Sequence, residues 1–460
     1  MLRHWLFCAF TIVFGILSAQ VRAESGVLLP HLTDSEGNSI SIIQPSISAT
    51  GTPGQFNITY VQSDNYQTPG YSGYSGNLYA ATVQVNSPTD WQMVGEPVML
   101  NESGSPVLAG YGDSSGGTSW LGNPWSSPFG GFRRPQLSGN TVVWTEYNTG
   151  GVHYYTFSDQ PGDPTSQGIV PVGGLGGNAN VSQGTIVSTA MQGPYNSVLS
   201  IYNPDGGGMI WVNDNKLSSA SSLVRSRYAW APRAADIVAT SETTGRVAFN
   251  MWVSPNLLAT CWSDYDLSTG TYTTPKPVYG YYGGSNIGIA PTNLLMDGDY
   301  LVLQSALYLG SYSKYRYYTR QMIPQPTIIM KWDPIADTYM FLTTLAPSTG
   351  ELSMTQPSLF GSYLVYGIDG GSRIEMTNLE TGEVWTIAED LSGFLDWPAV
   401  WVDKDTGQYV VLYQSSHSPD DLMIATTFVP EPATVGLLAV SGMFLVRRRK
   451  RASAPTQAAI

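Results

Sequence analysis

The amino-acid sequence predicts an all-β fold, and three observations support this prediction. Between residues 24 and 428, no stretch places apolar residues at the i, i+3, i+4, i+7 spacing of an amphipathic helix. Short runs rich in Val, Ile, Tyr, Trp and Thr instead alternate with clusters of Gly, Pro, Asn and Asp, which is the pattern of strands separated by turns. Gly and Pro supply 49 and 30 of the 460 residues, so turns must be frequent.

A loose internal repeat narrows the fold further. Its clearest copy runs from Pro135 to Trp144, and the stretch from Pro357 to Tyr366 matches it almost position for position. Weaker copies begin at Pro45, Ala179, Ala234, Pro291 and Pro398. The starts are 41 to 90 residues apart, which brackets the roughly 40 to 50 residues of a four-stranded propeller blade. The seven copies therefore predict a β-propeller of six or seven blades over residues 44–428, with a pair of β-sandwiches as the alternative.

Several copies contain a second strand that ends in Asp or Asn and runs into Thr-Gly, as in Asp266–Gly270 and Asn378–Gly382. The acid or amide side chain can bond the turn, and the glycine supplies the positive φ of a tight hairpin. This arrangement resembles the divergent propeller repeats of exported bacterial proteins related to the TolB translocation protein, and the resemblance implies a propeller over most of 44–428. The first interval is longer than the others because it holds Gly, Ser, Tyr and Trp-rich stretches at 63–77 and 101–133, which we expect to be surface loops.

The first 23 residues have the parts of a secretory signal peptide. Arg3 is followed by an apolar run from Trp5 to Leu17, and small residues at Val21 and Ala23 precede an expected cut before Glu24. A membrane-spanning helix is the alternative, but the run is short for a bilayer. Residues 24–43 would then form an N-terminal segment ahead of the repeat domain.

The C-terminus combines a helix-breaking triplet, an apolar stretch from Ala433 to Val446, and a basic cluster ending at Arg451. The apolar stretch would span about 21 Å as a helix, which is short for the roughly 30 Å hydrocarbon core. We expect a short transmembrane helix within 429–451, a cytoplasmic tail at 452–460, and the main body on the outside of the membrane. An ordinary C-terminal membrane anchor is the alternative interpretation of this region.

The same region resembles the PEP-CTERM sorting signal of Gram-negative bacteria. The residues that match its motif are Pro430, Glu431, Pro432, Arg447, Arg448 and Arg449. The resemblance implies that a membrane-embedded exosortase is a partner, that the protein is anchored transiently in the inner membrane, and that the tail is removed. It also implies delivery to the cell surface or an extracellular matrix.

Charge and cysteine content exclude several functions for the body. Of 21 basic residues, two precede Glu24 and five lie at 447–451, so residues 24–446 hold 14 basic and 34 acidic residues and have a net charge of −20. Such a domain repels phosphate backbones, so we expect no nucleic-acid partner. Cys261 is the single cysteine after the signal peptide, so the body can form no internal disulfide.

Candidate catalytic and metal-binding motifs are weak. The Gly-x-Ser-x-Gly match at 112–116 lacks the strand before it and the helix after it that a nucleophile elbow requires, and His153 and His417 are possible bases without a recognisable context. The glycine-rich 173–177 lacks the lysine and helix of a phosphate loop. Residues 403–407 could hold Ca²⁺ but more simply close a hairpin. We therefore expect no metal and no cofactor, although paired carboxylates for glycoside cleavage stay possible among 34 acidic residues.

Two basic clusters stand out against the acidic background. They comprise Arg225 and Arg227 in the first, and Lys314, Arg316 and Arg320 in the second. Along a strand, alternation would place the second set on one face and the neighbouring tyrosines on the other. Such a face suits an anionic polysaccharide, whereas the simpler alternative is that the arginines pair with acidic residues inside the protein.

Taken together, these observations favour an exported, non-catalytic envelope or matrix protein that acts through protein or polysaccharide contacts. The alternative function is a polysaccharide-active hydrolase or lyase on the same scaffold. Converging carboxylates or a His, Tyr and Arg set at the mouth of the central channel would favour the enzyme.

Overall fold

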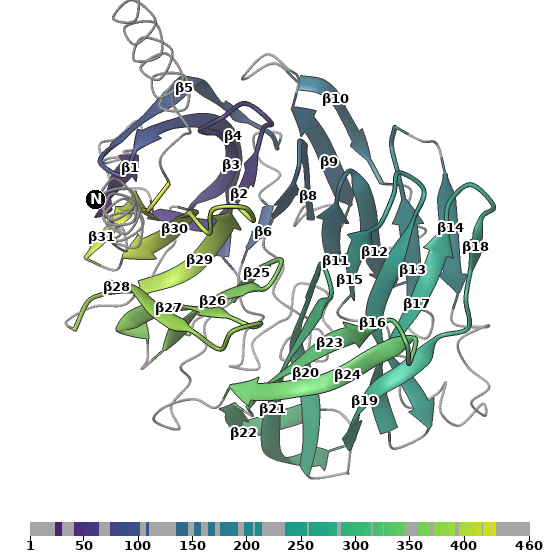
Figure 1. Ribbon diagram of the computed structural model, residues 1–460. Coiled ribbons are helices and arrows are strands. Elements are labelled where there is room, and N and C mark those ends of the chain that lie inside the picture. Colours follow the sequence, from purple (N-terminus) through teal and green to yellow (C-terminus); the bar gives the residue numbers. More distant parts are fainter. Residues whose placement is uncertain are drawn as a thin grey trace, which may run out of the picture.

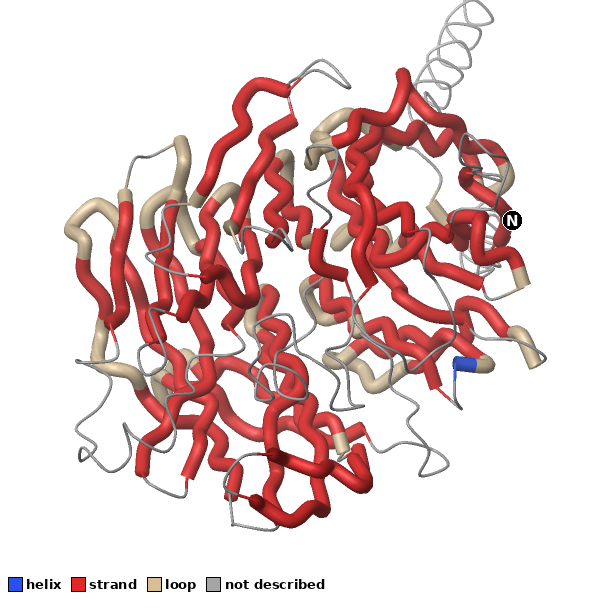
Figure 2. The backbone as a smooth tube through the Cα atoms, turned by 180° about the vertical axis from the view of Figure 1, so that it is seen from behind, coloured by secondary structure: helices blue, strands red, loops and turns tan. Residues whose placement is uncertain are grey.

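In the computed structural model, the residues that the structure describes form 31 strands arranged in seven antiparallel sheets (Figure 1). Strand dominates the part of the chain that the structure describes (Figure 2). The described residues are 24–29, 41–63, 74–101, 107–109, 135–145, 151–157, 164–170, 175–191, 197–205, 208–213, 235–254, 257–282, 287–313, 316–324, 326–345, 357–368, 371–391, 395–415 and 417–428.

Each sheet is one blade of a propeller, in which the strands are ordered from the innermost outward. Blade 1 contains β2 (Ser41–Ala49), β3 (Gln55–Ser63), β4 (Tyr74–Ser87) and β5 (Asp90–Met99), with β6 (Val107–Ala109) paired to β4. Blade 2 contains β7 (Gln136–Ser138), β8 (Thr141–Thr145), β9 (Val152–Phe157) and β10 (Pro164–Ile169). Blade 3 contains β11 (Leu175–Ser182), β12 (Thr185–Met191), β13 (Ser197–Tyr202) and β14 (Met209–Asn213).

The remaining blades follow the same order. Blade 4 contains β15 (Ala235–Ala239), β16 (Thr244–Ser254), β17 (Leu257–Asp266) and β18 (Thr271–Tyr272), with β19 (Lys276–Tyr282) also paired to β17. Blade 5 contains β20 (Ile287–Asp297), β21 (Tyr300–Ser313), β23 (Thr327–Asp333) and β24 (Thr338–Leu345), with β22 (Arg316–Pro324) paired to β21. Blade 6 contains β25 (Ser358–Phe360), β26 (Tyr363–Ile368), β27 (Arg373–Asn378) and β28 (Val384–Glu389). Blade 7 contains β29 (Leu395–Val402), β30 (Tyr409–Ser415), β31 (Ser418–Thr426) and β1 (Glu24–Leu29).

The innermost strands form a closed ring. Each contacts the innermost strand of the next blade, and β29 of blade 7 returns to contact β2 of blade 1. The prediction of an all-β propeller is therefore confirmed, with seven blades, and the alternative prediction of a pair of β-sandwiches is wrong. The predicted repeat starts fall at these strands. Pro45, Ala179, Pro291 and Pro398 lie within β2, β11, β20 and β29, Pro135 and Pro357 directly precede β7 and β25, and Ala234, outside the described residues, precedes β15.

The N-terminal strand β1 completes the last blade. It pairs antiparallel with β31, with Glu24 opposite Thr426 and Ser25 opposite Ala425. Blade 7 contributes only three strands of its own, so without β1 the outer edge of β31 would lack a partner. The segment that the sequence analysis placed ahead of the repeats thus supplies the strand that joins the two ends of the ring.

Side-chain contacts from blade 1 also hold β1 in place. The Trp91 indole Nε1 donates a hydrogen bond to the Val27 carbonyl at 3.1 Å. The same ring lies over Gly26, where a Cβ atom would stand 2.8 Å from Trp91. Any side chain at residue 26 would therefore push against the indole.

The hydrophobic core is divided among the joints between blades rather than gathered at one centre. The described residues form seven clusters of buried side chains, and each lies at a joint between neighbouring blades. The cluster between blades 1 and 2 also includes Trp397 of blade 7. The joint between blades 7 and 1 includes Leu28 and Leu29 of β1 together with Phe56 and Leu412. Stability therefore depends on closing the ring, because each blade buries its apolar surface only against its neighbours.

Cys261 lies in the joint between blades 3 and 4 and is 1 % exposed. Burial raises the pKa of its thiol to about 12, so almost none is thiolate at pH 8, and the thiolate is the reactive form. We expect the folded body to resist maleimide and disulfide reagents at pH 8. The measurement is mass spectrometry of labelling with and without denaturant, and rapid labelling of the native protein would contradict it.

Strand direction gives the propeller two unlike faces. Because neighbouring strands are antiparallel, the connection between the first and second strands of a blade opens on the same side as that between the third and fourth. We call this side the turn face. Its connections are short, such as 139–140, 298–299 and 379–383. The opposite side, the loop face, carries the longer connections, including 214–234 and 346–357.

Hydrogen bonds link the blades to one another along the turn face. Asn57 donates to Asn140 between blades 1 and 2, and Gln183 N donates to Ser138 between blades 2 and 3. Asn203 donates to the Glu242 carbonyl between blades 3 and 4. Further around the ring, Gly361 N donates to Asp297 Oδ2 at 2.6 Å between blades 5 and 6. Hydrogen bonds therefore brace the turn face across these four joints.

Candidate functional site

Two groups of charged side chains are candidates for chemistry, one on each face. The first, which we call the Arg246 cluster, lies at the turn-face end of the joint between blades 4 and 5 and comprises Arg246, Asp264, Lys276, Asp299 and Asp337. The second, the His417 pair, lies on the loop face and comprises Asp390 and His417. Their geometry decides which of them could meet a ligand.

Arg246 of β16 reaches from blade 4 into blade 5. Its Nη2 donates to Asp299 Oδ1 at 3.3 Å and to the Gly298 carbonyl at 3.5 Å. The guanidinium lies 4.3 Å from the centre of the Trp332 ring and 5.6 Å from that of Tyr339. The Arg246 side chain is 10 % exposed, so these contacts are made largely away from water.

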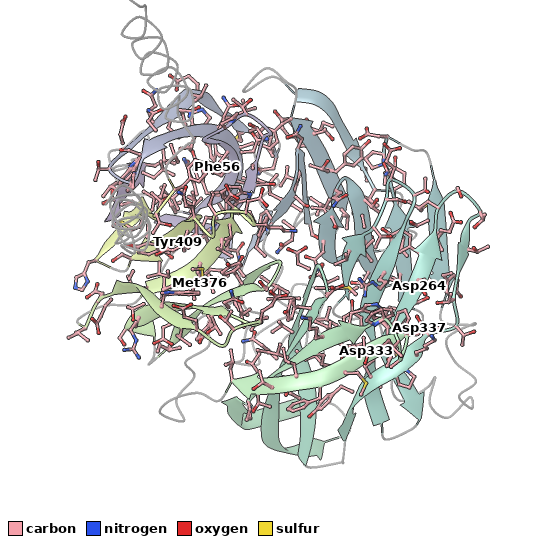
Figure 3. The ribbon with its side chains drawn as sticks, in the orientation of Figure 1. Phe56, Asp264, Asp333, Asp337, Met376 and Tyr409 are labelled. Carbon is pink, nitrogen blue, oxygen red and sulfur yellow. The ribbon has the colours of Figure 1, made fainter. Side chains whose placement is uncertain are left out.

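Asp264 and Asp337 lie near each other at this joint (Figure 3). Burial raises the pKa of Asp264, and the charge of Asp337 raises it further, while Arg246 and Lys276 act in the opposite direction. Lys276 Nζ lies 2.6 Å from Asp337 Oδ2 and 4.7 Å from the centre of the Trp262 ring. A pair of carboxyl groups is what a sugar-cleaving site requires.

The aromatic rings of this joint are, however, occupied by one another. Trp262 and Trp332 meet edge to face at 4.7 Å between ring centres, and Trp332 meets Tyr339 at 5.2 Å. Trp262 is fully buried and Tyr339 is 3 % exposed. These rings are in contact with one another and with Arg246 and Lys276, so the Arg246 cluster braces two blades.

The His417 pair is more accessible. His417 Nδ1 and Asp390 Oδ2 are 2.6 Å apart, and the two side chains are 54 % and 20 % exposed. Asp390 follows β28 of blade 6, where its backbone N donates to the Ser372 carbonyl at 2.7 Å. His417 lies between β30 and β31 of blade 7. A carboxylate that orients an imidazole in this way is the base half of a Ser-His-Asp arrangement.

His417 is one of the two possible bases in the sequence, but the sequence does not indicate a partner for it. Asp390 and His417 are 27 positions apart and come from different blades, so no local spacing could connect them. His153, the other candidate base, stacks on Trp144 at 5.7 Å within blade 2. The Gly-x-Ser-x-Gly match at 112–116 lies outside the described residues.

The predicted polysaccharide-binding residues are only partly described. Arg225, Arg227 and Lys314 lie outside the described residues, whereas Arg316 and Arg320 belong to β22, whose backbone pairs with the loop-face half of β21. Pairing skips Arg320, because Thr319 stands opposite Gly310 and Gln321 stands opposite Leu309. This β-bulge interrupts the strict alternation from which a shared face for Arg316 and Arg320 was predicted.

The remaining sequence candidates adopt ordinary structural roles. Asp403 Oδ1 accepts hydrogen bonds from the backbone N–H groups of Asp405 and Thr406 at 2.9 and 3.3 Å, and Gly407 has a φ of 70°. Residues 403–407 therefore close a hairpin, which is the simpler of the two roles predicted for them. Asp266 and Asn378 bond their turns in the same way. Leu175–Gly177 begin β11, and Gly173 and Gly174 lie outside the described residues. Among the described residues, no group of three or more His, Cys, Asp or Glu side chains is placed to hold a metal ion.

Both chain ends fall outside the described residues, including the predicted signal peptide at 1–23, the short transmembrane helix and the sorting residues Pro430, Glu431, Pro432, Arg447, Arg448 and Arg449. Within the described part of the chain, no helix has the length and apolar character needed to cross a membrane.

Comparison with known families and structures gives one sequence match and several similarities of fold. Residues 428–451 match the PEP-CTERM protein-sorting motif. No curated protein matches the chain. The propeller domain of the Trilobed protease from Pyrococcus furiosus is 8 % identical, with a TM-score of 0.41, over 85 % of this chain and 99 % of that one.

Two further solved structures are similar to the same extent. Trypanosoma rangeli sialidase is 10 % identical with a TM-score of 0.39, over 95 % of this chain and 64 % of that one. A catalytically inactive virginiamycin B lyase from Staphylococcus aureus, solved with quinupristin, is 11 % identical with a TM-score of 0.43, over 88 % of this chain and all of that one. Similarities this distant say nothing about what the present chain binds or catalyses.

Proposed function

We propose that this protein, which its PEP-CTERM motif marks as exported and sorted by an exosortase at the membrane, acts as a non-catalytic component of the cell envelope or extracellular matrix. It is anchored briefly in the inner membrane through its tail and is then delivered to the cell surface or beyond. The observation that carries the proposal is a sorting motif that follows directly on a closed propeller body.

The body has the properties of a contact module. Its turn face is braced from blade to blade, and its loop face carries longer connections on which a binding surface can be built without disturbing the ring. The basic residues of β22 belong to the loop-face half of blade 5, within residues 24–446, whose net charge is −20. We propose that an anionic extracellular polysaccharide is the ligand, held by salt-dependent contacts with Arg316 and Arg320, together with Arg225, Arg227 and Lys314.

The sorting step is tested by Glu431→Ala. This substitution should leave export intact but keep the full-length chain in the inner membrane, because the triplet that the motif requires is altered. Fractionation and immunoblotting would measure the outcome, with Glu383→Ala, an exposed carboxylate of the turn face, as the matched control. Release and trimming of Glu431→Ala at the parental rate would contradict the proposal.

Polysaccharide contact is tested by co-sedimentation of residues 24–428 with purified matrix polysaccharide. We expect binding at about 50 mM salt that falls at least tenfold at about 500 mM, because exposed charge contacts are screened. Changing Arg316 and Arg320 to Ala should weaken binding at low salt, whereas Lys404→Ala on the turn face should not. Binding that persists at high salt and after the double substitution would contradict the proposed contact, and these arginines would then have only a structural role.

The second candidate function is a polysaccharide hydrolase or lyase, and the His417 pair is the observation that favours it. If it is correct, incubation of the body with the polysaccharide should release reducing ends or unsaturated products, and His417→Gln should abolish this release. The non-catalytic proposal expects no release from either protein. Release of product by the parent protein but not by the His417→Gln variant would support the enzyme and contradict the non-catalytic proposal.

A further inference from the structure

The two ends of the described body leave it side by side. Glu24 begins β1 and stands opposite Thr426, which ends β31. Thr427 N donates to the carbonyl of Tyr409, the first residue of β30, at the turn that joins β29 to β30. That turn belongs to the turn face, so the chain enters and leaves the propeller there, at the outer part of blade 7.

Very few residues separate the folded body from the apolar stretch of the sorting tail. Phe428 is 5 % exposed and packs edge to face on Phe56 and Trp401, with ring centres 5.4 and 5.5 Å away. The apolar stretch of the tail begins five residues later, at Ala433. Five residues can extend by at most about 18 Å, so an inserted tail must hold blade 7 close to the membrane.

The short connection also limits which face can meet the membrane. β31 has nine residues, and a strand of that length spans about 30 Å from the turn face to the loop face. A connection of about 18 Å that starts at the turn face cannot pass along the blade and reach the opposite side. The loop face is therefore excluded as the membrane-facing side, which leaves the turn face or the outer edge of a blade.

Burial of Phe428 favours the turn face. A body lying on its edge would need the chain to run outward directly after β31, whereas Phe428 is buried in the joint between blades 7 and 1 and packs on Trp401 of the innermost strand β29. Building on the proposed insertion of the tail, we propose that the anchored propeller stands on the lipid surface by its turn face. Its loop face, with the basic residues of β22, then points away from the cell membrane.

The charge of the turn face agrees with a contact that is short-lived. The exposed charged residues of its turns are mostly acidic and include Asp205, Glu242, Asp299, Asp337, Glu380, Glu383 and Asp405, alongside Lys404. Anionic lipid headgroups repel such a surface within a Debye length of about 8 to 10 Å. The tail alone then holds the body down, and cutting the tail frees it.

Three exposed positions along strand β28 can report the distance of each face from the membrane. Thr381 precedes the strand on the turn face, Thr386 lies in its middle, and Leu391 follows it on the loop face, and all three are exposed. Cysteine would be introduced at each position in the full Glu431→Ala chain and labelled with a fluorophore, since the buried Cys261 stays silent. Quenching by nitroxide-labelled lipid headgroups in inner-membrane vesicles reports the distance of each label from the bilayer.

We expect the Thr381→Cys label to be quenched at least threefold more than the Leu391→Cys label, with Thr386→Cys between them. Insertion of ten Gly and Ser residues after Phe428 should remove the difference, because it adds the missing slack. Equal quenching at all positions, or strongest quenching at residue 386 or 391, would overturn the proposal.

A second variant of the protein tests the orientation independently of the proposed sorting function. It replaces residues 433–446 by an ordinary 20-residue transmembrane helix and keeps residues 429–432 as the connection. If the Glu431→Ala chain is not recovered in the membrane, the proposed anchoring through the sorting tail is wrong. The orientation is then decided on the replaced chain by the same three labels.

Discussion

Removing residues 24–29 is expected to destabilise the body by at least about 4 kcal/mol. Leu28 and Leu29 are 7 and 8 % exposed in the joint between blades 7 and 1, and loss of a buried leucine side chain costs about 2 to 5 kcal/mol each. Deletion also leaves the outer edge of β31 without a partner. Denaturant unfolding of residues 24–428 and 30–428, followed by circular dichroism, measures the difference.

A point substitution on the same strand provides the control for this deletion. Val27 is 40 % exposed, so Val27→Thr should change the free energy of unfolding by less than about 0.5 kcal/mol. The double substitution of Leu28 and Leu29 by Ala should reproduce most of the effect of the deletion. If the truncated and complete bodies unfold at the same denaturant concentration, closure of the ring by β1 does not contribute to stability.

Replacing Arg246 by Ala is expected to lower the free energy of unfolding by about 2 kcal/mol. The substitution removes a shielded cation from the face of Trp332 and a charged hydrogen bond to the blade 5 turn. Arg246→Lys keeps the charge but loses the flat guanidinium, so an intermediate loss is expected. Equilibrium denaturation at constant pH and salt measures all variants.

The neighbouring lysine is the matched control for this prediction. Lys276 makes a closer ion pair with Asp337, at 2.6 Å, but its side chain is 45 % exposed and that of Asp337 62 %. Exposed pairs contribute about 0 to 1 kcal/mol, so Lys276→Ala should cost less than about 1 kcal/mol. An equal loss for Arg246→Ala and Lys276→Ala would show that the buried stacking contributes nothing extra.

The repeat in the sequence was sufficient to predict the blades because each innermost strand has its own local signal. The Gly139 and Gly361 turns follow those strands and have φ values of 58° and 56°, as a tight hairpin requires. The closing strand β1 had no such signal. Its partner β31 lies about 400 residues away, and only the folded ring brings Glu24 to Thr426.

The candidate sites were harder to predict for the same reason. The His417 pair joins two blades, and the Arg246 cluster joins two others, so neither has a fixed spacing along the chain. The predicted common face of Arg316 and Arg320 relied on alternation, which an extra residue in one strand is enough to break. The export of the protein and its sorting tail could still be predicted from the sequence, because they depend on the type and order of residues and not on contacts in the folded protein.

The position of β31 has a mechanical consequence for the anchored protein. This strand is hydrogen-bonded along both edges, to β30 and to β1, and the sorting tail continues from its end. When a ligand holds the loop face and the membrane holds the tail, the pulling force runs along the strand. Hydrogen bonds on both edges then bear the load together in shear instead of opening one after another. The strand through which the propeller is tethered is thus also the one best placed to resist extraction.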